Sequence, residues 1–394
     1  MVTVFWICVL LVLYPYVAYP ALIAALAFLR PWPIRPVGAA VSSVTFVMAA
    51  RNEGQRIRQR VEELIVQLEV AGVEGHVIVV LDGPDDPITL PAAVAGRRVE
   101  ALYFPCNKGK AAAITAGAAL AKSEIVAFAD VRQKWQSDAL KCLLENFKDP
   151  QVGAVSGELI LETSPGINAG VGLYWRFEKW LRAKESIVDS VVGVTGAICA
   201  VRRELFDGVP KGMVLDDVYW PLCVVMKGFR VQHDRRAYAF DCLPLRPRDE
   251  LRRKIRTLSG NYQLLQRLPT LLLPWRNRIC FQYLSHKLLR LAVPWALIGA
   301  FAASAASDDT PYRWLFWTQA IGYTVVVLAM VTGMSKYSRL VAAGLSFVML
   351  NVAAWLAFWT WLFGNASQSW IAVDYIDPDL KASSVSHPAR LNDA

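Results

Sequence analysis

The sequence predicts an α/β domain with a mostly parallel sheet, flanked on both sides by transmembrane helices. Between Val41 and about Leu268, short β-branched runs alternate with longer helical patterns. This alternation is typical of parallel strands joined by crossover helices that cover both faces of a sheet. Before and after this region lie uncharged stretches long enough to cross a hydrocarbon core of about 30 Å.

The composition excludes several classes of protein. Of 394 residues, 55% are hydrophobic and 19% are charged, whereas a disordered chain is poor in apolar residues and rich in charge. The charged fraction lies below the roughly 25% usual for soluble proteins. The net charge is +9, and the Lys and Arg residues concentrate between Arg30 and Arg290. This distribution fits the cytoplasmic side of a membrane protein better than a nucleic-acid binder.

The Cys and His residues argue against a disulfide or zinc framework. The seven Cys are scattered with no CxxC pair, which indicates a reducing compartment. The four His lie far apart and form no HExxH motif, so a histidine-based metal site is not expected.

The first element in order is a membrane span. Residues 2–29 carry no charge, and neither a basic segment nor a small-residue cleavage site marks them as a signal peptide. Arg30, Arg35 and Arg51 follow directly. By the positive-inside rule the N-terminus is expected outside the cell and the following region in the cytoplasm.

Three further spans are expected near the C-terminus, at 291–307, 314–335 and 340–363. The first has about the minimum length for a span. For each of them the alternative is a buried core helix. Asp308 and Asp309 are expected on the outer side of the membrane. Lys336 and Arg339 are expected on the cytoplasmic side, which places the tail after Ser369 on the outer side again.

Within the α/β region, polar residues follow four expected strands. The strands are 44–50, 76–81, 99–104 and 125–129, with helices over 55–68 and 109–121; the polar residues are Asn52 and Glu53, then Asp82, then Lys108 and Lys110, then Asp130 and Arg132. Ligands of such sheets bind beyond the carboxyl ends of the strands. A single Asp-Gly turn is usually structural, but four polar strand ends at one rim are harder to explain as turns alone.

These residue types suit a nucleotide diphosphate. Backbone amides near Asn52 at a helix start suit ring and anion contacts. Asp82 can accept hydrogen bonds from a base or a ribose. Lys108 and Lys110 put positive charge at a helix N-terminus, where phosphate would lie. Asp130 is a hard oxygen ligand that suits a Mg²⁺ or Mn²⁺ held mainly by diphosphate.

Two more groups occur later in the chain. Asp216 and Asp217 open an expected helix over 218–226. One acidic residue there would be an ordinary cap, but two can include a general base, with one facing the site while the other caps or pairs. The basic segment 248–256 is expected mostly at the solvent or membrane surface. It contains Arg256, and an Arg is also a good bidentate ligand for a diphosphate.

Seven segments in order carry a family resemblance. They are VTFVMAARNEG, HVIVVLDGPDD, NKGKAAAITAGAAL, IVAFADVRQ, VTGAICAVRRELF, LDDVYWPLCVVMKGFRV and RRKIRTLSGNYQLL, over roughly residues 44–266. Together they resemble the membrane-bound family 2 glycosyltransferases with the GT-A (Rossmann-like) fold, the branch of the cellulose, hyaluronan and poly-N-acetylglucosamine synthases. The arrangement of one span before the catalytic domain and several after it is also similar.

The resemblance implies roles for the nucleotide side of the site. Glu53 and Asp82 match positions that contact the nucleotide, and Asp130 matches the first Asp of the Asp-x-Asp metal and diphosphate motif. Arg132 stands where the second Asp usually is. Either Asp130 holds the metal with water and diphosphate, or Arg132 replaces part of the cation's charge.

The resemblance also implies a base and a diphosphate ligand. Asp217 matches the catalytic base, Asp216 replaces the usual Glu before it, and Arg256 matches the Arg that binds the donor diphosphate. Thr257 stands where processive synthases have a Trp at the acceptor end. This departure favours transfer of one or a few sugars.

The expected organisation has five parts: an N-terminal transmembrane helix (1–30), a cytoplasmic GT-A catalytic domain (41–248), interfacial amphipathic helices (249–286), three transmembrane helices (287–364) and a polar tail (365–394). The expected activity is inverting transfer of a sugar from a nucleotide sugar, a UDP-sugar in most of the family. The acceptor is a lipid-linked saccharide or a polysaccharide at the bacterial cytoplasmic membrane, with Mg²⁺ or Mn²⁺ as cofactor. Membrane lipids are expected partners and nucleic acid is not, while the oligomeric state stays open.

Two alternatives remain. One is a membrane protein with a degenerate nucleotide-sugar domain that regulates or partners a synthase. Arg132 and Thr257 favour it, whereas the retained Asp82, Asp130, Asp217 and Arg256 oppose it. The other is a transporter, but the expected spans carry no intramembrane charge that would give it an ion or solute path.

Overall fold

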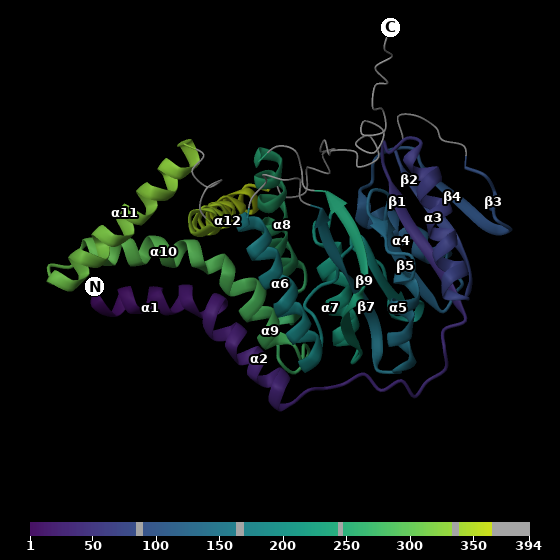
Figure 1. The fold of residues 1–394 in the computed structure, drawn as a ribbon, viewed down its shortest axis with the longest axis horizontal. Helices are drawn as coiled ribbons and strands as arrows, with labels where there is room; N and C mark the ends of the chain where they lie inside the picture. The colour runs from purple at the N-terminus through teal and green to yellow at the C-terminus, as the bar shows by residue number, and fades with distance from the viewer. Residues whose placement is uncertain (84–89, 163–168, 243–246, 333–338, 365–394) are drawn as a thin grey trace, which may run out of the picture.

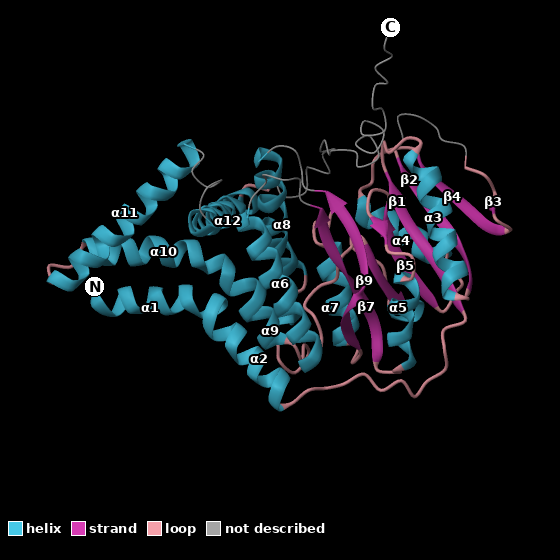
Figure 2. Cartoon of the chain, in the orientation of Figure 1, coloured by secondary structure: helices cyan, strands magenta, loops and turns pink. Residues whose placement is uncertain are grey.

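The computed structural model describes residues 1–83, 90–162, 169–242, 247–332 and 339–364. A twisted sheet with its covering helices forms one half of the molecule, and long helices form the other (Figure 1). Helices α6 (Ala169–Val188), α8 (Pro247–Arg267) and α9 (Cys280–Tyr283) lie between the two halves (Figure 1). Colouring by secondary structure separates the strand-rich part from the helical part (Figure 2).

In the described residues the sheet has nine strands in the order β3-β4-β2-β1-β5-β8-β7-β9-β6. The strands are β1 (Ser43–Ala50), β2 (Glu74–Asp82), β3 (Ala93–Val94), β4 (Arg97–Phe104), β5 (Ile125–Asp130), β6 (Lys134–Trp135), β7 (Val152–Glu162), β8 (Ile198–Arg202) and β9 (Arg230–Cys242). Strands β4, β2, β1 and β5 are parallel neighbours. Strand β8 runs antiparallel to both β5 and β7, and β9 is parallel to β7. The four expected strands are confirmed, and their carboxyl ends share one rim.

Helices cover both faces of this sheet because successive strand residues point to opposite sides. Phe46 and Met48 belong to the buried cluster that includes α3 (Arg56–Ala71) and α5 (Ala139–Glu145). The intervening Val47 belongs to the cluster with α4 (Lys110–Leu120) and α7 (Asp216–Met226). Helices α4 and α7 therefore begin at the sheet rim, where their first residues reach the candidate site.

The remaining helices make up the helical half of the molecule. They are α1 (Val2–Leu13), a π-helical turn (Tyr14–Ala18), α2 (Tyr19–Leu29), α6 (Ala169–Val188), α8 (Pro247–Arg267), α9 (Cys280–Tyr283), a second π-helical turn (Leu284–Leu288), α10 (Leu289–Ala305), α11 (Thr310–Thr332) and α12 (Arg339–Leu362). Short 3₁₀ segments cover Asn146–Lys148, Arg203–Leu205 and Pro269–Leu272.

Three helices among the described residues are long and apolar enough to cross a membrane: Val2–Leu29, Cys280–Ala305 and Val341–Leu362. They correspond to the expected spans 2–29, 291–307 and 340–363. The second begins earlier than expected, at Cys280, because Lys287 and Arg290 lie inside the helix instead of ending it. The expected span 314–335 overlaps α11, which is not among the three, and its residues 333–335 lie outside the described residues, as do Lys336 and the tail 365–394.

Close packing of α4 on the sheet depends on Gly117. A methyl group added there would lie 2.5 Å from Val47 Cγ1 and 3.1 Å from Val80 Cγ2. Alanine favours a helix over glycine by about 1 kcal/mol, but forcing an extra methyl into a packed core costs about 1–3 kcal/mol.

We therefore expect Gly117→Ala to lower the melting temperature of the detergent-solubilised protein. Gly322→Ala in α11 is the control, because its added methyl meets no described atom within 4 Å and it should not destabilise. A higher melting temperature for Gly117→Ala would contradict this packing.

Candidate active site

The turn after β1 brings Asn52 and Glu53 to the rim. Asn52 has a φ of 53°, in the left-handed region that Asn tolerates better than most residues. The pKa of the Glu53 carboxyl is raised by burial, and Arg132 and Arg56 offset part of this effect. Asp130 adds to the rise. Glu53, Asp130 and Arg132 therefore share one electrostatic environment, as the sequence predicts.

Asp82 anchors the turn that leads into α4. Its buried carboxylate accepts hydrogen bonds from the backbone amides of Lys108, at 2.6 Å, and Gly109, at 2.8 Å. The Lys108 ammonium lies 4.3 Å from the centroid of the Phe104 ring. Asp82 thus orients the loop before α4. Of the two lysines, Lys110 is the one that bonds to Asp130 among the acidic residues described next.

Lys110 is the cation at the centre of the site. Its ammonium donates to Asp130 Oδ1 at 2.7 Å. Although burial opposes the change, Asp130 and Asp216 raise the pKa of Lys110, and Asp217 adds to this rise. A methyl group on Gly196 would lie 3.5 Å from both Lys110 Nζ and the Asp217 Cβ. Carboxylates from β5 and from the start of α7 therefore surround one ammonium group.

Asp216 and Asp217 occupy the first turn of α7, and no side-chain hydrogen bond caps that helix at its N-cap Leu215. Both lie in the field of Lys110. Burial and, next, the neighbouring Asp216 raise the pKa of Asp217 to about 6, while Lys110 opposes the rise.

The two carboxylates nevertheless have different surroundings, as expected for adjacent helix residues. Burial also raises the pKa of Asp216, and its other charged neighbours include Asp130 and Arg256. For Asp217 the other neighbours are Lys287 and Arg182. Asp216 therefore faces the residues expected to bind a diphosphate, whereas Asp217 faces α6 and the helix that begins at Cys280.

Arg182 is a site residue that the sequence did not reveal. It lies on α6 and donates to Thr195 Oγ1 at 3.1 Å, to Ser156 Oγ at 2.9 Å and to the Gly193 carbonyl at 3.1 Å. These bonds hold the segment that carries Gly196 beside Asp217. No motif marks Arg182, since α6 lies in a stretch where only a helical pattern is visible.

Few side chains in the site could act as ligands for a metal ion. Among the described residues, no three Asp, Glu, His or Cys side chains are grouped in a way that would hold a metal ion. Asp130, with a side chain 30% exposed, offers a single carboxylate at the rim. One carboxylate fits a Mg²⁺ or Mn²⁺ whose other ligands come from phosphates and water.

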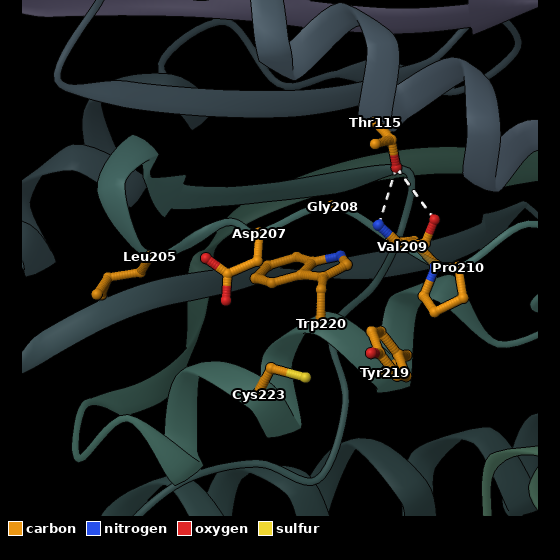
Figure 3. Close-up of a pocket in the computed structure, with 9 residues that line it drawn as sticks. All are labelled: Thr115, Leu205, Asp207, Gly208, Val209, Pro210, Tyr219, Trp220 and Cys223. Atoms are coloured by element: carbon orange, nitrogen blue, oxygen red, sulfur yellow. Dashed lines mark hydrogen bonds between the residues drawn. The ribbon is translucent and has the colours of Figure 1, made fainter. Parts of the chain in front are cut away.

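A separate cavity of about 320 Å³ lies beside α4 and α7 (Figure 3). Thr115 accepts from the Val209 amide at 2.8 Å at one end of it. Asp207, whose carboxylate pairs with Lys227 at 2.7 Å, lines it as well. None of the acidic residues around Lys110 lines this cavity, so it is distinct from the candidate active site.

Two kinds of comparison bear on this architecture. Residues 45–209 match the family described as "Glycosyl transferase family 2". No curated protein matches the chain significantly. The family match ends before Asp216, so it covers the strand ends that carry Glu53, Asp82 and Asp130 and not the acidic pair on α7.

One solved structure shares the fold over most of its length. The mannosyltransferase PcManGT from Pyrobaculum calidifontis, in complex with GDP-Man and Mn²⁺, superposes with a TM-score of 0.65 at 21% identity, over 91% of this chain and 99% of that one. GalNAc-T7 with UDP, GalNAc and Mn²⁺ matches 52% of this chain and 43% of its own, at 12% identity and a TM-score of 0.37. Residues 45–209 thus match glycosyltransferase family 2, and the chain has a GT-A-like glycosyltransferase fold.

Proposed function

We propose that the protein is an inverting glycosyltransferase that moves a sugar from a nucleotide-sugar donor to a lipid-linked saccharide or polysaccharide at the bacterial cytoplasmic membrane. The observation that carries the proposal is the group of Lys110, Asp130, Asp216 and Asp217 at the rim of a family 2 domain. It combines a rim suited to a diphosphate with a carboxylate whose pKa lies near neutrality.

The proposed mechanism is a single displacement. Asp217 removes the proton from the acceptor hydroxyl as that oxygen attacks the anomeric carbon. The bond between that carbon and the donor diphosphate breaks on the opposite face. Arg256 and Lys110 stabilise the negative charge of the leaving nucleotide. Gly196 leaves space beside Asp217, because any side chain there would approach the Asp217 carboxylate.

The cofactor belongs to the same proposal. Asp130 is the residue that would hold Mg²⁺ or Mn²⁺ together with the donor diphosphate, and such an ion supplies Lewis-acid stabilisation of the leaving phosphate. The Lys110 ammonium on Asp130 and the nearby Arg132 already supply positive charge at this place. The Mn²⁺ bound by the neighbouring mannosyltransferase structure supports a divalent cation.

Two classes of nucleotide-sugar donor fit the proposal. The family resemblance favours a UDP-sugar, whereas the structural neighbour binds GDP-Man. The testing experiment measures release of nucleotide diphosphate by the purified full-length chain with UDP-sugars and GDP-mannose, each with Mg²⁺ or Mn²⁺. Release from one donor supports the enzyme. Binding without any release would favour the degenerate partner of a synthase instead.

The first prediction concerns the base. Asn at position 217 keeps the shape of Asp but cannot take a proton, so Asp217→Asn should reduce transfer about 10²- to 10⁴-fold with donor affinity nearly intact. In the parent chain, transfer should fall about tenfold per unit as the pH drops below about 6, where Asp217 becomes protonated. Steady-state transfer between pH 5 and pH 8 measures both effects.

Asp216→Asn is the matched control for this prediction. It removes a negative neighbour that raises the pKa of Asp217, so it should lose less turnover and move the acidic limb of the pH profile downward. An Asp whose folded pKa is raised destabilises the folded chain as the pH rises from about 4 to about 6. Asp217→Asn should therefore melt higher than the parent at pH 8 but not at pH 4. Near-parental transfer by Asp217→Asn would rule out this base.

The second prediction concerns the diphosphate. Asp130→Asn and Arg256→Ala should each weaken metal-dependent donor binding, because each removes a ligand for the cation or the phosphate. Arg132→Asp should make transfer more dependent on added Mn²⁺, since it removes a fixed charge and adds a carboxylate. Titration calorimetry and Mn²⁺ titrations of activity measure these changes. An unchanged metal dependence in Arg132→Asp would place that side chain outside the catalytic chemistry.

The third prediction concerns topology. Arg30, Arg35 and Arg51 favour a cytoplasmic catalytic domain, so a Cys at position 308 should react with a membrane-impermeant thiol reagent in intact cells. In a Cys8→Ser background, the exposed Cys106 of the catalytic domain provides the internal control. It should react only after the cells are opened. Labelling of Cys106 in intact cells would reverse the orientation and remove access to cytoplasmic nucleotide sugars.

A further inference from the structure

One imidazole ring joins α6 to an apolar helix. His286 lies in the π-helical turn Leu284–Leu288, near the start of the apolar helix Cys280–Ala305, and it is buried. Its Nδ1 lies 2.8 Å from Glu185 Oε1, and its Nε2 lies 3.0 Å from Glu178 Oε2. Both carboxylates belong to α6, where they lie about two turns apart. The ring therefore bridges two carboxylates of one helix.

The two contacts require a ring that donates at both nitrogens. An ionised carboxylate only accepts hydrogen bonds, and a neutral imidazole has one donor and one acceptor. Although burial opposes it, Arg290 and His286 hold the pKa of Glu178 well below its usual range, so this carboxyl is ionised. A neutral His286 would direct a nitrogen lone pair at one of the two carboxylates. The geometry therefore favours the imidazolium, which makes two charge-assisted hydrogen bonds.

The carboxylate of Glu185 depends strongly on this ring. Its Oε1 also accepts from the Tyr19 hydroxyl of α2 at 2.6 Å. Its Oε2 is buried and accepts no hydrogen bond from the described residues. Glu178, in contrast, has Arg290 as a second cationic partner. Because a buried charge that loses its partner is strongly destabilising, a neutral group in place of His286 should loosen the hold on α6.

Other charged and titratable groups surround the bridge. They are Tyr14 and Tyr16 in the first π-helical turn, Tyr174 and Arg182 on α6, Lys254 on α8, and Lys287 and Arg290 in the helix of His286. Within the described part of the chain, His286 is the side chain that bonds to both Glu178 and Glu185. It is therefore the group whose loss would release α6 at both places.

The bridged helix carries Arg182 to the candidate active site. Glu178, Arg182 and Glu185 lie at the spacing i, i+4 and i+7, which places them on one face of α6. The Arg182 guanidinium donates to the Gly193 carbonyl and to Thr195 Oγ1, each at 3.1 Å. The position of α6 therefore sets the position of the segment that contains these two acceptors.

That segment is bonded in turn to the proposed base. The Val194 amide donates to the Asp217 carbonyl at 2.8 Å. The next amide, that of Thr195, donates to Ser156 Oγ at 2.9 Å, and the same oxygen accepts from Arg182. A continuous chain of contacts thus runs from the apolar helix through α6 to the first turn of α7.

From this chain of contacts we infer that His286 is a positioning residue for Asp217: as an imidazolium it fixes α6, and α6 holds through Arg182 the segment that bonds to the proposed base. The inference rests on the proposed glycosyl transfer, because that reaction gives Asp217 its role. His286 itself takes no proton from the acceptor and forms no bond to either substrate. The geometry of the base therefore depends on how an apolar helix packs against α6.

Hydrogen exchange tests this role without requiring catalysis. The exchange of the Val194 and Thr195 amides is measured by mass spectrometry on the full-length chain in neutral detergent. His286→Gln places an amide oxygen, which is an acceptor, against one of the two carboxylates. The contacts that Arg182 makes should then open more often, and both amides should exchange about tenfold faster or more.

Two milder variants keep the test independent of folding. His286→Lys retains a positive charge that only donates, so exchange at the two amides should stay within about threefold of the parent. Tyr19→Phe removes only the hydroxyl that donates to Glu185. It should speed exchange in the same direction as His286→Gln but less, and it replaces that variant if the latter does not fold.

Arg236→Gln is the matched control. Arg236 pairs with the buried Asp234 at 2.7 Å and with Glu145 at 2.8 Å, so the variant also takes a cation from a buried carboxylate. Glu145 belongs to α5, which covers the sheet face opposite α7. Arg236→Gln should therefore lower the melting temperature and leave exchange at Val194 and Thr195 unchanged.

A double-variant cycle tests the route through Arg182. Arg182→Gln should itself speed exchange of the two amides. Adding His286→Gln to that variant should change the rates by less than about twofold, because residues that act through one contact are not additive. Effects that multiply fully would mean that His286 acts by another route, and they would overturn the inference.

The pH profile of transfer gives a second readout. Burial raises the pKa of Asp217, and the charged groups around it are Asp216, Lys110, Lys287 and Arg182. The last two lower that pKa, and they belong to the two helices that His286 joins. His286→Gln should therefore move the acidic limb of transfer to higher pH and lower kcat, with little change in the KM for the donor. Arg236→Gln should leave the limb in place.

The outcomes separate this inference from the proposed function. Parental exchange in both His286→Gln and Tyr19→Phe would overturn the role of His286, whether or not the parent transfers sugar. Equal acceleration in His286→Gln and Arg236→Gln would show general destabilisation and would overturn it as well. Acceleration specific to His286→Gln, in a chain that transfers no sugar, would support the link from His286 to Asp217 and count against the proposed function alone.

Discussion

The ammonium of Lys110 is the charge on which the arrangement of the site depends. Asp130 comes from the end of β5, while Asp216 and Asp217 come from the first turn of α7, and Lys110 at the start of α4 lies in the field of all three. Carboxylates brought together without a cation repel one another and take up protons. Because Lys110 bonds Asp130 directly at 2.7 Å, it holds the end of β5 and the acidic pair of α7 within one site.

That central charge also explains how two adjacent carboxylates can differ. Both lie in the field of Lys110, but Asp216 shares its surroundings with Asp130 and Arg256. Asp217 instead faces Arg182 and Lys287, from α6 and from the apolar helix that follows. The surroundings of β5 and those of α6 thus meet at one peptide unit, where burial is the largest cause that raises the pKa of Asp217 to about 6.

The long apolar helices are part of the site's construction. Glu178 and the buried Glu185 on α6 bind His286, Arg290 and Tyr19. Although burial opposes it, Arg290 and His286 hold the pKa of Glu178 well below its usual range. Breaking such a buried pair by removing one partner is strongly destabilising. Helix α6 is therefore fixed between the sheet, through Arg182, and the apolar helices, through Glu178 and Glu185.

The sequence by itself determined the strands, the helices between them and the polar residues at their ends. Hydrophobic periodicity is local, and parallel strands joined by crossover helices bring Glu53, Asp82, Lys110 and Asp130 to one rim. The start of α7 at Asp216 was equally visible. Only the tertiary structure decided which of these groups meet. Lys108 and Lys110 are equivalent in the sequence, but the first lies at the Phe104 ring and the second bonds Asp130. Arg182 and Lys287 carry no motif, because their importance arises from contacts with residues far away in the chain. Lys287 and Arg290 seemed to end a hydrophobic stretch, yet they lie inside the helix, because a charge can remain within an apolar helix where other helices supply its partners, as Glu178 does for Arg290.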